Sequence, residues 1–195
     1  MTCRAAGSSL SSMDSTREAP ISEEIFDVVN ARDEVIDQAP RALVHAKNLL
    51  HRAVHVLVFS PDGKLFLQKR SMKKDCFPGT WDSSASGHLD QGESYDACAM
   101  RELEEELGCR SDQPLDQCFK LPASIETGWE FVWVYRTTHP GPFILHPEEI
   151  ERGDWFDKDS LDRWIKTQPG DFAPSFLLVW KTFLDHSAAT SGLKD

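Results

Sequence analysis

The chain has 195 residues, with 21 Lys and Arg against 32 Asp and Glu, and its formal net charge is −11. This length suits one domain with a single buried core, and the negative charge disfavours binding to nucleic-acid backbones. No apolar run approaches the roughly 18 residues of a membrane-spanning helix, and the start lacks the apolar segment of a secretory signal. We therefore expect a cytoplasmic protein that binds neither nucleic acid nor membranes.

The first 20 residues are rich in Ser and predict a disordered tail at 1–20. We place one domain at residues 21–188 and a second short tail at 189–195. Five cysteines are scattered along the chain without a C-x-x-C pair. This pattern favours free thiols over zinc knuckles or redox motifs.

Turn residues and apolar alternation predict the elements of the first half of the chain. They predict strands at 24–30, 34–38, 51–60 and 65–70, with a short helix at 41–50. The first two strands form a hairpin, and Pro61-Asp62-Gly63-Lys64 predicts the turn between the last two. A loop at 77–81 then leads to a helix that is rich in glutamate.

The second half predicts further strands, at 118–125 and 130–137 and before Trp155-Phe156, and a Pro/Gly-punctuated loop at 139–147. Asp157 or Ser160 is expected to cap a helix through 165, and a last helix is expected at 175–184. Strands flanked by a few helices indicate an α/β sandwich.

The glutamate-rich helix carries the most informative pattern. Glu102, Glu105 and Glu106 fall at i, i+3 and i+4, which places their carboxylates on one helix face. Like charges at this spacing destabilise a helix by roughly 0.2–0.5 kcal/mol per pair. A hard divalent cation would relieve the repulsion, because Mg²⁺ prefers carboxylate oxygens and also binds phosphate. The alternative is an acidic helix face in solvent.

The residues around the glutamates agree with a helix. Ser94 suits the N-cap, and Gly108 follows the last apolar residue, as a C-terminal glycine should. Met100, Leu103 and Leu107 recur on the side opposite the glutamates. One face of the helix is therefore expected to be buried while the other presents an acidic cluster.

Residues 87–108 match G-x5-E-x7-R-E-x-x-E-E-x-G, which resembles the signature of Nudix hydrolases. These enzymes cleave nucleoside diphosphates that are linked to another group. The resemblance implies an α/β/α sandwich with a mixed β-sheet and a small-molecule diphosphate substrate. It also implies Mg²⁺, with Mn²⁺ as an alternative, held by Glu102, Glu105, Glu106 and the carbonyl of Gly87. Cys109 departs from the aliphatic residue usual in the family.

The same resemblance gives roles to other residues of this motif, which we call the Nudix box. Glu93 and Arg101 are expected to support the metal ligands, because a guanidinium can hold a carboxylate through two hydrogen bonds. Glu106 or Glu102 is the candidate general base for the attacking water. The family also makes a homodimer plausible.

Residues outside the box are further candidates. Some family members place the base in a later loop, and three glutamates lie in that region: Glu148, Glu149 and Glu151. Arg70 is a candidate phosphate contact, and His88 adjoins the box glycine, so it is a candidate substrate contact. Lys73 and Lys74 are interpreted as part of a solvated loop. Three tryptophans are candidates for stacking on a base, with the core as the default for the last: Trp81, Trp129 and Trp133.

The flanking sequences HRAVHVLVFSPDGKLFLQKRS and FPGTWDSSASGHLDQGES resemble isopentenyl-diphosphate isomerases. Those enzymes carry a catalytic Cys where this chain has Ser86, and a hydroxyl is a much poorer acid and base than a thiol. Two histidines and one glutamate match metal ligands of the isomerases: His51, His88 and Glu130. His45 differs from a third by one residue in spacing, and Gly128 replaces a second glutamate. We therefore expect a hydrolase, with an isomerase or a ligand-binding module as alternatives.

Overall fold

The computed structural model describes residues 24–191. The expected tail at 1–20 and residues 192–195 lie outside the described residues. The elements in chain order are β1 (Ile25–Val29), β2 (Val35–Pro40), α1 (Arg41–Ala46), β3 (His51–Phe59), β4 (Leu65–Arg70), β5 (Trp81–Asp82), β6 (Ala85–His88), α2 (Tyr95–Leu107), β7 (Asp116–Leu121), β8 (Glu130–Thr138), β9 (Ile150–Phe156), α3 (Lys158–Thr167), a 3-10 turn (Pro169–Asp171) and α4 (Pro174–Ser191).

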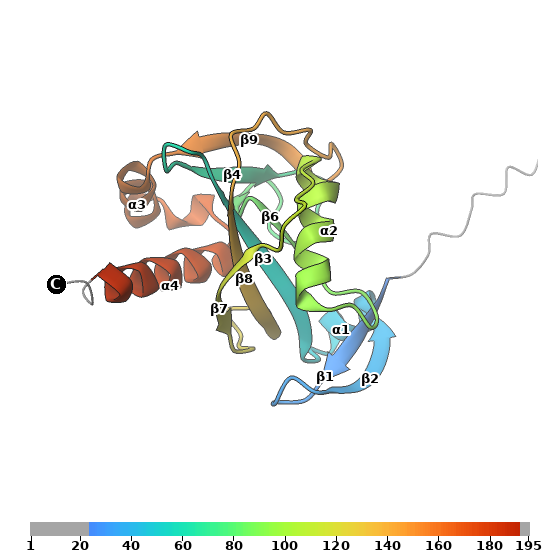
Figure 1. The fold of residues 1–195 in the computed structure, drawn as a ribbon. Helices are drawn as coiled ribbons and strands as arrows, with labels where there is room; N and C mark the ends of the chain where they lie inside the picture. Colours follow the sequence, from blue (N-terminus) through green and yellow to red (C-terminus); the bar gives the residue numbers. More distant parts are fainter. Residues whose placement is uncertain (1–23, 192–195) are drawn as a thin grey trace, which may run out of the picture.

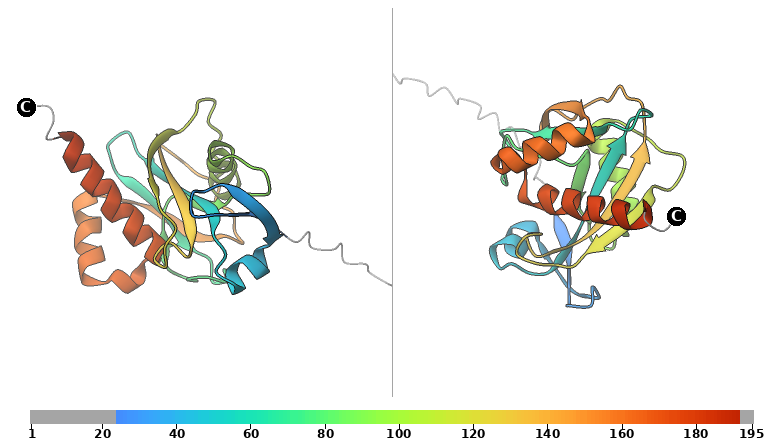
Figure 2. Two further views of the ribbon diagram at one scale, coloured as in Figure 1. Left: turned by 90° about the horizontal axis from the view of Figure 1, so that it is seen from below. Right: turned by 90° about the vertical axis from the view of Figure 1, so that its left-hand side faces the viewer.

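The main sheet has seven strands and lies between helix α2 on one side and helices α3 and α4 on the other (Figures 1 and 2). The path β5-β4-β3-β8-β7 is extended by β6, which pairs with β3, and by β9, which pairs with β4. Strands β3 and β8 run parallel, whereas the other named pairs are antiparallel. The predicted α/β/α sandwich with a mixed sheet is therefore confirmed.

Strand β3 divides the apolar core into two parts because alternate side chains point to opposite faces of a sheet. Ala53 and Leu57 join the core beneath α3 and α4. Val54, Val56 and Val58 join the core beneath α2. A strand that is covered on both faces is apolar along most of its length. The sequence of β3, HRAVHVLVF, has this character.

The hairpin β1–β2 and helix α1 form a smaller unit beside the main sheet (Figure 1). Phe26, Val28, Ala39 and Val44 pack together as a third apolar cluster. The predicted hairpin is confirmed, but α1 ends at Ala46 rather than at residue 50. Its last turn closes by backbone bonds, and Asn48 adopts a left-handed conformation with φ 51° that stops the helix.

Asp33, in the hairpin turn, anchors this unit to the main sheet. Its carboxylate accepts hydrogen bonds from Arg52 Nε at 2.6 Å, from the Tyr95 hydroxyl at 2.9 Å and from Lys120 Nζ. Burial alone would raise the pKa of Asp33, but these three donors hold it below its usual value. The hairpin is thus tied to β3, α2 and β7 by charge-assisted hydrogen bonds.

Several boundaries differ from the sequence-based predictions. Strands β5 and β6 lie in the polar segment WDSSASGH, which has no apolar alternation, and form because neighbouring strands pair with them. Strand β7 starts two residues earlier than expected and ends at Leu121. Helix α4 continues to Ser191, past the expected domain boundary at 188. Among the described helices, none is both long and apolar enough to cross a membrane.

A close contact between β4 and β9 gives a test of the packing. A Cβ at Gly153 would lie 2.1 Å from the ring of Phe66, whereas a Cβ at Gly170 would meet no atom within 4 Å. We expect Gly153→Ala to lower the free energy of unfolding by about 1–3 kcal/mol because the buried ring must shift. Gly170→Ala should change it by less than about 0.5 kcal/mol. Urea unfolding of both variants measures this, and equal stabilities would contradict the packing described.

Candidate active site

Helix α2 turns its acidic face partly towards the sheet. The Ser94 side chain caps its first turn by accepting from the Ala97 N–H at 3.2 Å, and Gly108 ends it with φ 63°. Glu102 and Glu106 are buried, with 9% and 4% exposure. The Glu105 side chain is 57% exposed. The helix was predicted correctly, but two of its three clustered glutamates lie inside the protein.

Two donors from the sheet hold the carboxylate of Glu106. Gln68 Nε2 donates to Glu106 Oε2 at 2.8 Å, and the backbone N–H of Ser86 donates to the same oxygen at 2.9 Å. Gln68 faces α2 because it follows Phe66 by two positions on β4, and Phe66 belongs to the core on that side. These donors fix the orientation of the Glu106 carboxylate against β4 and β6.

The backbone of Gly87 lies directly against the carboxylate of Glu102. A Cβ at position 87 would lie 1.9 Å from Glu102 Oε1 and 2.1 Å from its carboxyl carbon. The space beside Gly87 is therefore filled by the carboxylate itself, so any larger residue would displace it. This contact places the backbone of β6 beside both buried carboxylates, since the neighbouring Ser86 N–H bonds to Glu106.

Arg101 is the centre of the ion-pair network of the box. Its Nε and Nη2 donate to the two oxygens of Glu93 at 3.0 and 2.8 Å. Its Nη1 donates to Glu102 at 2.7 Å and to Glu105 at 3.0 Å. Nη2 also donates to the carbonyl of His88 at 3.0 Å. The guanidinium thus holds three carboxylates and one backbone carbonyl, as the planar donor geometry of Arg allows.

Burial makes the carboxylates electrostatically costly. Burial, and then the charge of Glu105, raises the pKa of Glu102 to about 7 even though Arg101 opposes this. Burial, and then the charge of Glu102, raises the pKa of Glu106 well above its usual range. Carboxylates that disfavour each other's charge, gathered beside the backbone of Gly87, form an oxygen-donor set that fits a hard divalent cation.

Each of the three glutamates at the start of β9 and in the loop before it pairs with a lysine from β4 or the loop after β4. Glu148 accepts from Lys73 at 2.7 Å, and both side chains are largely exposed. Glu151 pairs with Lys69 at 3.2 Å, on the face of β4 opposite to Gln68. The strand alternation therefore directs Glu151 away from the box.

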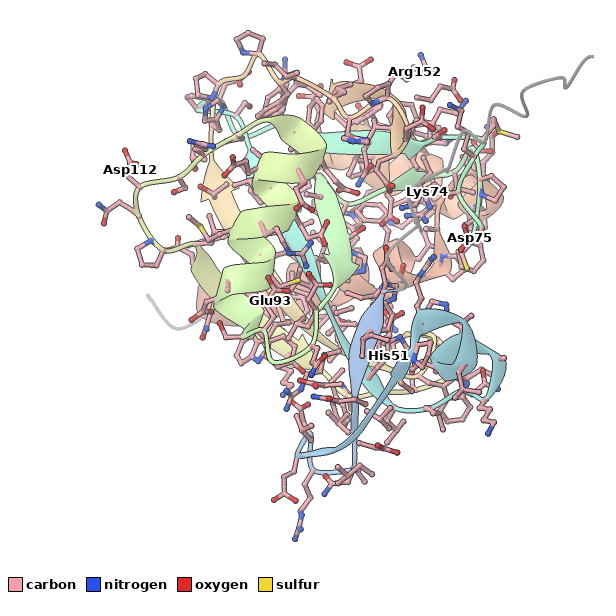
Figure 3. All side chains as sticks on the ribbon, turned by 90° about the vertical axis from the view of Figure 1, so that its right-hand side faces the viewer. His51, Lys74, Asp75, Glu93, Asp112 and Arg152 are labelled. Atoms are coloured by element: carbon pink, nitrogen blue, oxygen red, sulfur yellow. The ribbon has the colours of Figure 1, made fainter. Side chains whose placement is uncertain are left out.

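Lys74 pairs with Glu149, and its side chain is 23% exposed. Its charge is near enough to lower the pKa of both Glu102 and Glu106. The interpretation of Lys74 as a solvated loop residue is therefore wrong, although it holds for Lys73. Figure 3 shows Lys74 in the loop after β4 and Glu93 at the start of α2. No sequence signal marked Lys74, because its partner lies 75 residues away.

Two predicted substrate contacts point elsewhere. Arg70 donates to Asp82 at 3.1 Å and to the carbonyl of Cys76 at 3.1 Å, so its guanidinium is used within the fold. The His88 ring lies 2.9 Å from Glu130. It belongs to a group that we call the histidine cluster: His45, His51, His88 and Glu130.

The three candidate stacking tryptophans have different surroundings. Trp81 is 5% exposed and packs edge-on against Phe156 and Trp164, so its interpretation as a stacking residue is wrong. Trp133 packs against the core beneath α2. Trp129 is half-buried in the turn before β8, where it has φ 69°.

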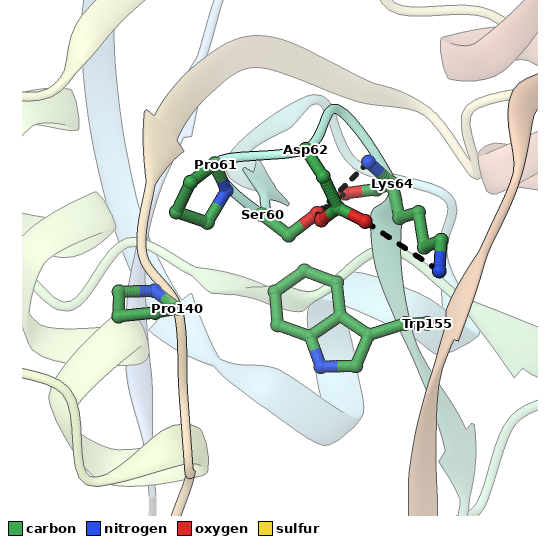
Figure 4. Close-up of a pocket in the computed structure, with 6 residues that line it drawn as sticks. All are labelled: Ser60, Pro61, Asp62, Lys64, Pro140 and Trp155. Carbon is green, nitrogen blue, oxygen red and sulfur yellow. Dashed lines mark hydrogen bonds and ion pairs between the residues drawn. The ribbon is translucent and has the colours of Figure 1, made fainter.

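An open pocket near the β3–β4 turn lies apart from the box (Figure 4). Its lining residues are Ser60, Pro61, Asp62, Lys64, Pro140 and Trp155. Asp62 accepts from the Ser60 hydroxyl at 2.5 Å and lies 3.5 Å from Lys64. The two charged side chains that line the pocket are therefore paired with each other. No box residue contributes to this pocket.

The chain is similar to known proteins along most of its length. The NUDIX domain model matches residues 49–176. A Nudix hydrolase of Streptomyces coelicolor is 42% identical over 166 residues, covering 82% of this chain and 91% of that protein. An isopentenyl-diphosphate Delta-isomerase of Serratia proteamaculans is 32% identical over 162 residues, covering 82% and 90%.

A solved structure is also similar. The protein DR0079 of Deinococcus radiodurans has a TM-score of 0.65 and 28% identity, covering 74% of this chain and 90% of that one. The domain match spans well over half of the chain and includes the whole acidic helix with its buried glutamates. The chain therefore belongs to the Nudix family.

Proposed function

We propose that the protein is a Mg²⁺-dependent hydrolase that cleaves a pyrophosphate linkage in a nucleoside diphosphate derivative by attack of water on phosphorus. The observation that carries this proposal is the burial of Glu102 and Glu106 against the backbone of Gly87. Family membership and the hydrolase relatives support the general reaction. The metal and the nucleotide substrate belong to the proposal.

Mg²⁺, or Mn²⁺ in its place, would be held by Glu102, Glu105, Glu106 and the carbonyl of Gly87. Such an ion supplies charge neutralisation on the diphosphate and makes water a better nucleophile. The protein's part is to keep the ligands in place. Two hydrogen bonds orient Glu106 from the sheet, and Arg101 orients Glu102 and Glu105 from the helix. Ligands held this way need little reorganisation during the reaction.

The proton of the attacking water needs an acceptor near the box. Glu106 and Glu102 are candidates because burial raises the pKa of both carboxyls and so makes them better bases. Glu149 is the candidate from the later loop, since its lysine partner approaches the box. Lys74 would be free to contact a phosphate oxygen if Glu149 released it.

An isopentenyl-diphosphate isomerase is the second candidate, because the Serratia relative carries that name and covers most of the chain. The residue before Gly87 argues against it. Ser86 supplies its backbone N–H to Glu106, and its hydroxyl is too weak an acid to protonate an alkene as a thiol could. The hydrolase remains the proposal.

Removal of divalent ions tests the metal requirement. We expect EDTA to abolish nucleotide or phosphate release from a panel of nucleoside di- and triphosphates and nucleotide sugars. Excess Mg²⁺ alone should restore it, because the buried carboxylates form an oxygen-donor set. Full turnover in EDTA would show that the glutamates act without a metal ion.

Substitutions on α2 compare the effect on kcat of a buried glutamate with that of an exposed one. Glu106→Gln keeps the volume but removes a proposed metal ligand and base, so kcat should fall by about 10²–10⁴-fold. Its melting temperature in EDTA should not fall, because a buried charge is removed. Glu104→Gln is the matched control, since Glu104 pairs with Arg110 on the outer side. Similar kcat values for the two variants would support a solvated acidic helix instead.

Deuterium incorporation separates hydrolysis from isomerisation. With isopentenyl diphosphate and Mg²⁺ in D₂O, we expect proton NMR to show no dimethylallyl product and no deuterium uptake. Ser86→Ala should leave nucleotide hydrolysis nearly unchanged, because the backbone N–H that contacts Glu106 is retained. Isomerisation by the native protein that is lost in Ser86→Ala would overturn the hydrolase proposal.

A further inference from the structure

The entry loop, which we define as residues 89–94, leads from β6 into α2 and belongs to the box. Two of its backbone N–H groups donate to β1. That of Gln91 donates to the carbonyl of Ile25 at 3.1 Å, and that of Gly92 donates to Asp27 Oδ2 at 2.9 Å. Figure 1 shows β1 and β2 beside the end of α2 at which this loop arrives. The hairpin unit, which comprises β1, β2 and α1, therefore holds the middle of the entry loop.

Asp27 reaches the entry loop with both of its carboxylate oxygens. Its Oδ1 accepts from Gln38 Nε2 at 3.1 Å, and Gln38 lies directly opposite it on β2. The Gln38 side chain in turn accepts from Gln91 Nε2 at 2.8 Å. Asp27 is only 5% exposed, and a buried carboxylate is tolerated only when its oxygens are hydrogen-bonded. The burial of Asp27 therefore depends on its contacts with the loop.

The backbone conformation of Gly92 directs its N–H at Asp27. Its φ is 74°, in the left-handed region that favours glycine. A Cβ at this position would meet no atom within 4 Å, so conformation rather than space calls for glycine here. The next residue is Glu93, and the position of its backbone therefore follows from that of Gly92.

Glu93 carries this constraint into the helix. Both of its oxygens accept from Arg101, at 3.0 and 2.8 Å, and Oε2 also accepts from the Asp90 N–H at 3.0 Å. The Glu93 side chain is 14% exposed. Arg101 then donates to the buried Glu102 at 2.7 Å. A continuous set of hydrogen bonds thus runs from the hairpin unit to a carboxylate of the box.

The hairpin unit lies outside the region that defines the family. The match to the NUDIX domain model begins at residue 49, whereas α1 ends at Ala46. The unit nevertheless supplies acceptors to a loop inside the matched region. Its own position is fixed independently, because Asp33 binds β3, α2 and β7 without contacting the entry loop. The unit is therefore a fixed support for the entry loop.

We propose that Asp27 is a positioning residue of the box. It fixes the backbone at Gly92, so that Glu93 keeps its place beside Arg101. Arg101 in turn orients Glu102, one of the proposed metal ligands. The inference rests on the proposed function, because it takes the box to be a metal site. Outer contacts that orient ligands typically change metal affinity by about 10–100-fold, and Asp27 is expected at the lower end because it acts through other residues.

Binding of Mn²⁺ to the full chain, stripped of metal with a chelator, tests the proposal. Electron paramagnetic resonance measures the free ion during the titration. Asp27→Ala should lower the affinity for Mn²⁺ by about 10-fold. Asp27→Asn should restore most of it, because its carbonyl oxygen can still accept from Gly92 N–H. Glu106→Gln should lose this equivalent of Mn²⁺, which assigns the ion to the box.

Two control variants separate positioning from general stability. Asp37 is exposed on the same hairpin, and its carboxylate accepts from the N–H of the next residue. Asp37→Ala should therefore bind Mn²⁺ with native affinity. Val44 is fully buried in the apolar cluster of the hairpin unit. Val44→Ala should lower the melting temperature but leave the affinity at 25 °C unchanged, since it does not touch the entry loop.

A double-mutant cycle tests the route of the effect. If Asp27 acts through Glu93, then Asp27→Ala should lower the Mn²⁺ affinity much less in a Glu93→Gln background than in the native chain. Residues of one hydrogen-bond network show such non-additivity, whereas independent sites add. Full additivity of the two changes would overturn the proposed route.

Hydrogen exchange follows the loop itself in the metal-free protein. Peptides that span residues 89–94 should exchange faster in Asp27→Ala than in the native chain, because the Gly92 amide loses its acceptor. Asp37→Ala should exchange at the native rate. Equal exchange in all three proteins would show that Asp27 does not hold the loop, and would overturn the inference.

The Mn²⁺ titration distinguishes failure of the inference from failure of the proposed function. Native affinity in Asp27→Ala, when the native chain binds Mn²⁺ and Glu106→Gln does not, would overturn the inference and leave the metal site intact. No binding of Mn²⁺ by the native chain would overturn the proposed function and the inference with it. Circular dichroism of each variant verifies that lost binding does not reflect unfolding.

Discussion

The burial of two carboxylates between α2 and the sheet is the constraint on which the rest of the site depends. An unpaired buried charge is costly, so Glu102 and Glu106 need partners wherever the helix packs. Those partners are a glutamine side chain from β4, a main-chain N–H from β6 and the guanidinium of Arg101. The helix can therefore dock in one register, in which its acidic and apolar faces are both satisfied.

Strand β6 links the acidic box to the histidine cluster within four residues. The Ser86 N–H bonds to Glu106, and the backbone of Gly87 lies against Glu102. The His88 carbonyl accepts from Arg101 while its ring lies beside Glu130. Most of these contacts use the backbone, which explains why a short polar segment with little apolar character occupies a central place.

The charge around the site is arranged locally rather than by the net charge of −11. Each of Glu148, Glu149 and Glu151 is paired with a lysine that arrives from the β4 side. Of these pairs, only Lys74–Glu149 brings a cation near the box glutamates, and an exposed pair such as Lys73–Glu148 contributes little stability. An anionic substrate therefore depends on cations held close to the box, because more distant charges are screened by salt.

The sequence by itself determined the features that depend on local spacing. The glutamate periodicity, the Ser94 cap and Gly108 defined α2, and the alternation in β3 and β4 defined the core strands, because helix and strand periods are written in neighbouring residues. The family resemblance rested on the same spacing, and it also supplied the α/β/α sandwich.

Tertiary structure decided the features that depend on residues distant in the chain. The strands β5 and β6, the burial of Trp81 and the pairing of Lys74 with Glu149 all arise from contacts that no local pattern encodes. The resemblance to the isomerases grouped His51 and His88 with Glu130, but the sequence did not decide whether the His88 ring faces Glu130 or the box. Strand register makes that choice, since a shift of one residue turns every side chain to the opposite face of the sheet.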